Sequence, residues 1–309
     1  MSNAWRMTLN RRADRAVALF DGSAVPARRK ICKAKTARVA ALSGIAYYAE
    51  LQSIRMPSSM SRLAGVEQTL DLPPGYTLVA LRELGDAFAH GCDIAADAGA
   101  GTLIWVRRYD LVEFAVVLEP DEPLLSARQA FFAGMNATAD AIAAHCPPER
   151  EVTFDWPDTI RFDGGLLGGA RLGWPADCAE TDVPAWLVFS VILRAADMAH
   201  VGEVQAAAGV SLLSEGFELI DTDAIIESFA RHLMTAFDRW NERGFEAIAR
   251  DYLERLPKRK AGERRAIDLN GDLLVRPPNG SGAPDRTSLA DALARAAWYD
   301  PQARGPKFG

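Results

Sequence analysis

Lysine is missing from the central part of this sequence, because none occurs between Lys35 and Lys258. Any fixed positive charge there must come from arginine, which is not equivalent to lysine in reach or shape. A run of 18 apolar residues is also missing, which argues against a transmembrane helix. The four cysteines are scattered, without a Cys-x-x-Cys pair. This pattern argues against a disulfide framework or a zinc site, and we expect a cytoplasmic protein with no metal ligands.

The composition is that of an ordinary globular protein with enough length for a real core. Of the 309 residues, 49% are hydrophobic and 25% are charged. The net charge of −6 hides an asymmetry, because residues 1–65 hold 12 Lys or Arg and only 3 Asp or Glu. The remainder holds 23 basic and 38 acidic residues. An acidic body argues against nonspecific nucleic-acid binding, which depends on neutralising phosphates.

The basic segment 1–65 differs from the rest of the chain and has little apolar periodicity. Three interpretations stay open: a disordered tail, an organelle-targeting peptide, or translated sequence upstream of the true start at Met56 or Met60. We expect a segment outside the fold and do not favour targeting. The predicted organisation is therefore this segment, a main domain over 66–256 and a small module over 257–309.

Residues 154–174 show two short extended patterns around glycines, which is typical of a β-hairpin. With Gly164-Gly165 as the two-residue turn, Asp158 would lie directly opposite Arg171. The alternative places the turn at Asp163-Gly164 and shifts the register by one residue. From physics alone, this stretch is a hairpin with a buried tryptophan.

Hydrophobic periodicity predicts further elements on both sides of this hairpin. Strands are expected over 102–107, 111–118, 151–155 and 184–193, and helices over 84–98, 126–145, 225–242 and 244–256. The C-terminal residues predict a second hairpin with Asn270-Gly271 at its turn and a helix capped by Ser288. We expect the following Trp298-Tyr299-Asp300-Pro301 to pack back on the fold.

Five residues of the first hairpin carry a resemblance to a known family. Trp156, Pro157, Asp158, Gly168 and Gly169 match, in order and spacing, the signature hairpin of the biotin/lipoate protein ligase superfamily of biotin ligases, lipoate ligases and octanoyltransferases. The resemblance covers about residues 70–256. It implies an α+β fold, with the mixed, largely antiparallel sheet and packed helices of a class II synthetase-like catalytic domain. The small C-terminal α+β module would be an addition to that domain.

The sequence departs from the family pattern at two places. Asp155 stands where the family has the lysine before Trp-Pro. The family's long Gly-Arg-Gly-Arg loop over the adenylate is reduced to the short turn Arg108-Tyr109-Asp110. Both departures predict a diverged member whose adenylating activity is weak.

The resemblance implies attachment of biotin, lipoate or octanoate to a carrier-protein lysine through an acyl-adenylate, with ATP and Mg²⁺. Trp156, Pro157 and Asp158 would shape the ligand pocket, and Gly168 and Gly169 would let the ligand lie against the strand. Candidate cations in the ligand site are Arg107 and Arg108. The catalytic candidates are Arg171, Arg161 and Asp158.

Two rival hypotheses remain beside the ligase. In the first, the fold is kept as a non-catalytic module that binds a biotin-like or acyl ligand, or a protein partner. In the second, Cys178 carries the acyl group as a thioester. The expected partners are accordingly a small acyl or biotin-like ligand and a biotin or lipoate carrier domain, with no nucleic acid and no membrane.

Overall fold

The computed structural model describes residues 69–196, 209–217, 222–278 and 282–307. The predicted basic segment 1–65 lies outside the described residues. From Leu70 onwards the chain forms one compact unit, which includes the predicted C-terminal module. The boundary after residue 256 stays a prediction. In the described part of the chain, no helix has the length and apolar character that a membrane crossing requires.

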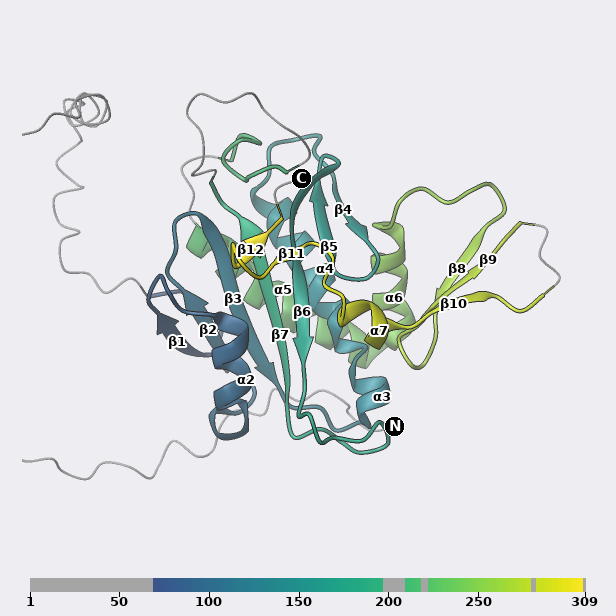
Figure 1. Ribbon diagram of the computed structural model, residues 1–309, viewed down its shortest axis with the longest axis horizontal. Helices are drawn as coiled ribbons and strands as arrows, with labels where there is room; N and C mark the ends of the chain where they lie inside the picture. The colour runs from purple at the N-terminus through teal and green to yellow at the C-terminus, as the bar shows by residue number, and fades with distance from the viewer. Residues whose placement is uncertain (1–68, 197–208, 218–221, 279–281, 308–309) are drawn as a thin grey trace, which may run out of the picture. The chain divides into compact units, whose positions relative to one another are not determined.

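A seven-stranded sheet forms the centre of the fold, in the order β1-β2-β3-β7-β6-β5-β4 (Figure 1). Only β1 and β2 pair in parallel, and the other neighbours are antiparallel. The predicted mixed, largely antiparallel sheet is thus confirmed. The strands are β1 (Thr77–Leu81), β2 (Thr102–Val106), β3 (Leu111–Leu118), β4 (Val152–Asp155), β5 (Thr159–Phe162), β6 (Gly165–Gly173) and β7 (Leu187–Arg194).

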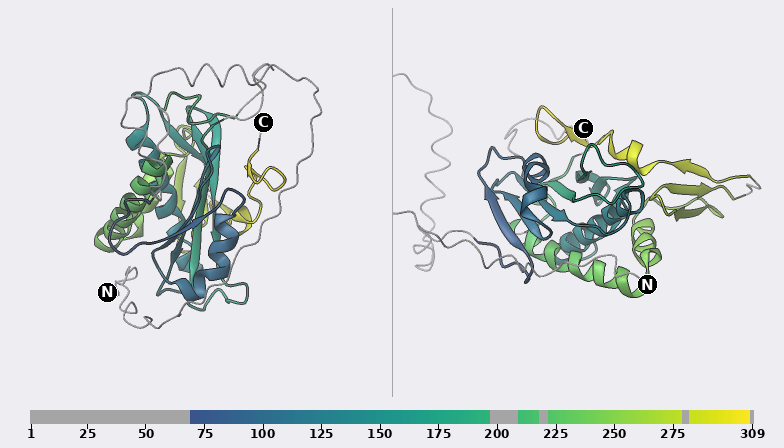
Figure 2. Two further views of the ribbon diagram at one scale, coloured as in Figure 1. Left: turned by 90° about the vertical axis from the view of Figure 1, so that its left-hand side faces the viewer. Right: turned by 90° about the horizontal axis from the view of Figure 1, so that it is seen from below.

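Helices cover the two faces of the sheet unequally (Figure 2). One face carries three helices, α4 (Ala130–His145), α5 (Thr222–Arg243) and α6 (Phe245–Glu254). The opposite face, called here the α2 face, carries α2 (Ala87–Ala98). Because side chains alternate along a strand, the apolar residues of β3 and β7 divide between the large core under α4, α5 and α6 and two smaller clusters on the α2 face.

Close packing of α4 on the sheet depends on Gly134. The ring of Phe189 on β7 lies against this glycine, and a Cβ at position 134 would stand only 2.5 Å from that ring. Phe189 is itself held by stacking on Phe229 of α5, with ring centroids 5.9 Å apart. The aromatic ring therefore cannot move away without disturbing the core.

We expect Gly134→Ala to destabilise the fold although alanine favours helices. Overpacking a filled core costs about 1–3 kcal/mol, which exceeds the helix-propensity gain of about 1 kcal/mol. Gly282→Ala is the matched control, because a Cβ there would meet no atom within 4 Å. Urea unfolding should show a lower midpoint for Gly134→Ala alone. Equal midpoints for the two variants would show that α4 can shift away from Phe189.

The first hairpin adopts the alternative register, so the predicted opposition of Asp158 and Arg171 is wrong. Asp163 and Gly164 form the turn with φ values of 48° and 82°, and Phe162 pairs with Gly165. Both central positions of a type I′ turn require positive φ, which aspartate and glycine tolerate. Beyond the turn the register shifts once more, between Ile160 and Arg161. The amide of Ala170, not Arg171, consequently bonds to the carbonyl of Asp158.

Two helix starts also differ from the prediction. The helix expected from residue 84 begins at Ala87, because the Asp86 side chain accepts from the amide of Ala89 and caps it. Leu84 is left exposed outside the helix. Ser126, expected to cap a long helix, instead lies inside the short α3 (Leu124–Ala127), and α4 starts only at Ala130.

The C-terminal residues form a second sheet and then return to the main one. Strands β8 (Arg264–Ile267), β9 (Leu273–Arg276) and β10 (Asp285–Thr287) make a three-stranded sheet, followed by α7 (Leu289–Leu293). The predicted hairpin is confirmed, with Gly271 at φ 82° in its turn, and so is the cap at Ser288. The chain then crosses the α2 face as a two-stranded ribbon, β11 (Tyr299–Asp300) and β12 (Gly305–Pro306) (Figure 2).

Candidate functional site

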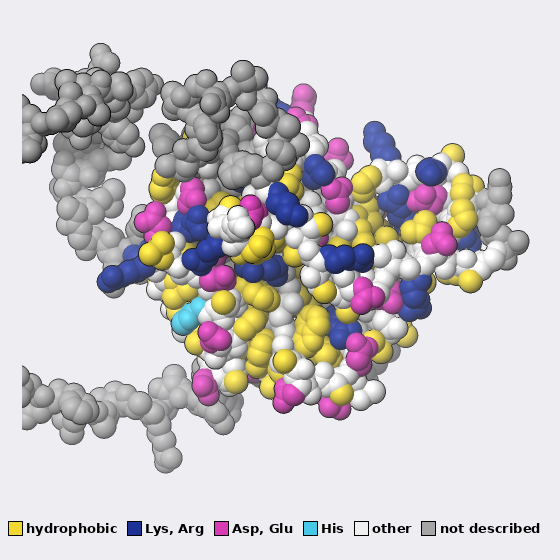
Figure 3. All heavy atoms as spheres, in the orientation of Figure 1, with side chains coloured by type: hydrophobic (Ala, Val, Ile, Leu, Met, Phe, Trp, Pro, Cys, Tyr) yellow, Lys and Arg dark blue, Asp and Glu magenta, His cyan; other side chains and the backbone are white. Residues whose placement is uncertain are grey.

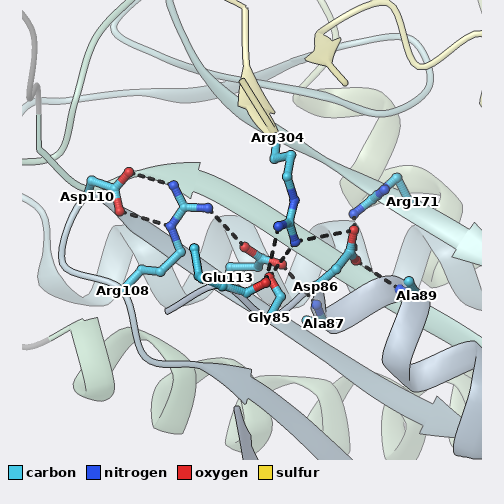
Figure 4. A network of polar contacts seen from close by, with 10 residues as sticks. Gly85, Asp86, Ala87, Ala89, Arg108, Asp110, Glu113, Arg171 and Arg304 are labelled. Atoms are coloured by element: carbon cyan, nitrogen blue, oxygen red, sulfur yellow. Dashed lines mark hydrogen bonds and ion pairs between the residues drawn. The ribbon is translucent and has the colours of Figure 1, made fainter. Parts of the chain in front are cut away.

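Arg171 of β6 is the main cation on the α2 face. Its guanidinium lies between two aromatic rings, 4.4 Å from the centroid of Phe88 and 4.6 Å from that of Tyr299. These two cation–π contacts stabilise the charged group in this position. Asp86 lies 3.7 Å away, beyond hydrogen-bond reach, and the buried Nε and Nη2 atoms have no hydrogen-bond partner (Figure 4). Buried donors without partners are rare, so they indicate a position where a bound group would accept from them.

Carboxylates occupy the amino-terminal end of α2 beside this arginine (Figure 4). Glu113 of β3 accepts from the amide of Ala87 at 2.9 Å, and Asp86 accepts from Ala89 at 2.9 Å. Burial raises the pKa of Glu113, although the Ala87 amide favours the charged form. Since these amides already have partners, the helix terminus itself is not open to an anion.

Asp158 lies at the start of β5 and is almost fully buried. Its Oδ2 and the indole Nε1 of Trp298 both lack a hydrogen bond of normal geometry. Burial raises the pKa of Asp158 to about 6, and the nearby Trp298 indole and Thr159 hydroxyl offset part of that rise. This carboxyl therefore titrates close to neutrality, a property common at binding and catalytic sites.

Replacing this carboxyl should change how stability depends on pH. Because the folded pKa is raised, the folded state binds more protons than the unfolded state between about pH 4 and 6. The free energy of unfolding therefore falls as pH rises through this window, by about 3 kcal/mol for a shift of about two units. Asp158→Asn should remove this fall, whereas Asp121→Asn, at an exposed loop residue, should keep it. Urea titrations at pH 4.5 and 7.5 that show the same fall in all three proteins would contradict the raised pKa.

The two glycines of the signature hairpin serve different purposes in the structure. A Cβ on Gly168 would lie 2.0 Å from the carbonyl oxygen of Ile192, so this glycine is required by the pairing of β6 with β7. Gly169 faces the α2 side, where a Cβ would lie 2.4 Å from the indole of Trp298. Only Gly169 therefore offers strand surface on the same face as Arg171.

Trp156 and Pro157 belong to the opposite face of the sheet. Trp156 stacks on Phe132 of α4, with ring centroids 5.6 Å apart. The carbonyl of Pro157 accepts from the hydroxyl of the buried Tyr252 at 2.7 Å. The structure thus divides the predicted pocket residues between the helix-covered core and the α2 face.

The remaining predicted arginines are engaged elsewhere or exposed. Arg161 donates to Asp155 at 2.6 Å and to the carbonyl of Gly164 at 3.0 Å, so the carboxylate at the family's lysine position already has a cation. Arg108 is held by both carboxylate oxygens of Asp110. Arg107 is exposed. Of the predicted cations, Arg171 is the one whose buried donors have no hydrogen-bond partner.

The α2 face is completed by residues that were not predicted as part of a site. Trp298 and Tyr299 cover Gly169 and Arg171, and Arg304 reaches the loop before α2. The sequence predicted that residues 298–301 would pack back, but nothing in it indicated the surface they would cover. Lys and Arg side chains lie in a band across the middle of this face, interleaved with acidic ones (Figure 3).

Comparison with known proteins identifies the class to which this fold belongs. The family model described as "Biotin/lipoate A/B protein ligase family" matches residues 72–254, which is more than half of the chain. The chain therefore belongs to this family, and the predicted resemblance is confirmed. The match ends at the last turn of α6, before the C-terminal sheet.

Individual relatives agree with this assignment. A biotin–[acetyl-CoA-carboxylase] ligase of Paracoccus denitrificans is 26% identical over 230 residues, 69% of this chain and 90% of that protein. The structure of a biotin protein ligase-like protein of unknown function from Silicibacter sp. superposes with a TM-score of 0.61 at 25% identity, covering 72% and 99% of the two chains. Biotin protein ligase from Aquifex aeolicus reaches 0.52 at 11% identity, covering 70% and 97%. The Aquifex enzyme has also been solved in complex with biotin and ATP.

Proposed function

We propose that this chain binds the carboxylate of biotin, or of a related acyl acid, at Arg171 on the α2 face. The observation that carries the proposal is the Arg171 guanidinium, whose buried Nε and Nη2 lack a hydrogen-bond partner and whose ion-pair contact with Asp86 is long, at 3.7 Å. Such a fork matches the two oxygens of a carboxylate or phosphate. The family membership and the biotin and ATP bound by the Aquifex enzyme support this choice of ligand.

The reaction that we propose is slow acyl transfer to a carrier-protein lysine through an acyl-adenylate. The acid's carboxylate would attack the α-phosphate of ATP and release pyrophosphate. The carrier lysine amine would then attack the acyl carbon of the mixed anhydride, releasing AMP and losing a proton as the amide forms. Arg171 would hold the charge that develops between carboxylate and phosphate. The surface of Gly169 would receive the acyl part, provided that Trp298 leaves it.

The charges around Arg171 support a low rate. Three arginines converge on this region, Arg108, Arg171 and Arg304 (Figure 4). Arg108 is bound to Asp110, and the carboxylates of Glu113 and Asp86 also lie among the arginines. Arg171 is therefore left as a single arginine to bind the triphosphate of ATP, in place of a cluster of arginines. Within the described residues, no group of three or more His, Cys, Asp or Glu could hold a metal ion. The described residues therefore offer no metal site of their own for Mg²⁺.

A second candidate is binding without adenylation, and one observation favours it. Asp155 stands at the family's lysine position and is paired with Arg161. The ion pair therefore provides no free positive charge for the reactants at this position. The geometry gives no support to acyl transfer through Cys178. Its thiol lies near the carbonyls of Ala179 and Asp182, and partial burial with nearby carboxylates raises its pKa, which disfavours the reactive thiolate.

Two measurements on the full chain separate these functions. Calorimetric titration with biotin, lipoate and octanoate measures binding, and pyrophosphate exchange with each acid measures adenylation. Binding with slow exchange, followed by transfer to a carrier domain, is the expected result. Binding without any exchange would establish the second candidate, and the absence of binding would overturn both.

A further inference from the structure

Residues 298–307 cross the α2 face as a small ribbon of their own. Strands β11 and β12 pair with each other, and neither joins the seven-stranded sheet through strand pairing (Figure 1). The amide of Lys307 bonds to the carbonyl of Trp298 and closes the base of the ribbon. The ribbon is therefore a separate unit resting on the sheet, which can leave without breaking the sheet's hydrogen bonds.

Trp298 occupies the strand surface at Gly169. The indole is almost fully buried and forms a small core with Leu111 of β3 and Ile192 of β7. A Cβ added to Gly169 would lie only 2.4–2.5 Å from the indole. No second molecule fits between this ring and the strand.

Tyr299 covers the cation next to it. The centroid of its ring lies 4.6 Å from the Arg171 guanidinium, which also contacts the ring of Phe88. The ribbon thus lies over both parts of the proposed site, the strand surface and the arginine. It does so without providing acceptors for Nε and Nη2 of Arg171.

A few side-chain hydrogen bonds anchor the tip and the base of the ribbon to the rest of the fold. Arg304 donates to the carbonyls of Leu84 and Gly85, at 3.1 and 2.6 Å, in the loop before α2. Arg194 of β7 donates to the carbonyls of Pro306 and Lys307, at 3.2 and 3.1 Å. Arg304 is 39% exposed, so water can replace its partners when the ribbon lifts.

We propose that residues 298–307 are an autoinhibitory ribbon that a ligand must displace from the α2 face. The inference rests on the proposed function, because it takes biotin or a related acid as the displacing ligand. The ribbon covers Gly169 with one aromatic ring and Arg171 with another, so binding requires the uncovered state. The apparent affinity is then the intrinsic affinity reduced by the fraction of molecules in which the ribbon has lifted.

Weakening the anchor should therefore strengthen binding. Arg304→Ala removes both bonds to the loop before α2 and the long ion pair of Arg304 with Asp86, at 3.9 Å, and it contacts neither Gly169 nor Arg171. We expect it to bind biotin, lipoate or octanoate about ten-fold more tightly than the wild type, because charged hydrogen bonds are lost only from the covered state. Arg295→Ala, an exposed arginine of the same module, is the matched control and should bind as the wild type does. Calorimetric titration of the full-length proteins measures all three affinities.

Hydrogen exchange of the wild-type chain provides the second readout. Saturation with the same acid should speed amide exchange in residues 298–307. Equal affinities for the wild type and Arg304→Ala, or slower exchange in this segment with ligand, would overturn the ribbon as an inhibitor and leave the proposed function standing. Binding by Arg304→Ala but not by the wild type would support both the proposed function and the inhibitory role of the ribbon. The absence of binding by either protein would overturn the proposed function and this inference with it.

Discussion

Arg171→Ala should weaken binding of biotin, lipoate or octanoate by at least about ten-fold and by up to about a hundred-fold. Each charge-assisted hydrogen bond to a carboxylate contributes about 1.5–3 kcal/mol, and Arg171 offers two buried donors without partners. The loss should be smaller for the neutral amide of the same acid. Arg171→Lys should give an intermediate affinity, because it keeps the charge but not the fork held between Phe88 and Tyr299.

Arg161→Ala is the matched control for this experiment. It removes an arginine from the same hairpin, but one that is already bonded to Asp155 and to the carbonyl of Gly164. Calorimetry should show wild-type affinity for this variant. An equal loss of affinity in Arg161→Ala and Arg171→Ala would mean that the general charge of the hairpin, rather than a specific contact, attracts the ligand.

Pyrophosphate exchange driven by these acids should be on the order of 10²–10³ slower than in a ligase that has the lysine before Trp-Pro. Loss of one preorganised donor from a transition state has this typical effect. The remaining exchange should disappear in Arg171→Ala. Exchange at the rate of an ordinary ligase would show that another group has replaced the lysine.

The structure changes what is expected of Asp155 itself. A free carboxylate at this position would repel both anionic reactants, and its removal would raise the rate. Because Arg161 neutralises it, Asp155→Asn should change exchange by less than about three-fold, a typical effect of partly exposed ion pairs. Asp163→Asn, at another acidic residue of the hairpin, serves as the control. A large gain in Asp155→Asn alone would mean that the carboxylate faces the reactants.

Much of the fold could be predicted because local patterns and burial agree. Residues 111–118 form a nearly continuous apolar run, and all eight are buried in a central strand of the sheet. The hairpin turn could not be predicted in the same way. Both Gly164-Gly165 and Asp163-Gly164 fit the local rules for a two-residue turn. One contact that distinguishes the two positions comes from a residue far along the chain, because a Cβ on Gly165 would meet Val210.

The site shows a similar division. Asp158, Gly169 and Arg171 lie close together in sequence, so a hairpin motif was enough to select them. The side chains that cover them, Trp298 and Tyr299, are well over a hundred residues away, and their sequence pattern predicts only that they are buried somewhere. Trp156, which the motif also selected, packs in the helix-covered core, where its large apolar ring stacks on Phe132.

A crystal structure of the full chain with biotin would show directly whether Arg171 holds the ligand. We predict that the biotin carboxylate lies within hydrogen-bond distance of Nε and Nη2 of Arg171, at about 2.7–2.9 Å. The acyl chain should lie against Gly169, and Trp298 should have moved off this glycine. Biotin bound elsewhere, with Trp298 still on Gly169 and no ligand at Arg171, would contradict this prediction.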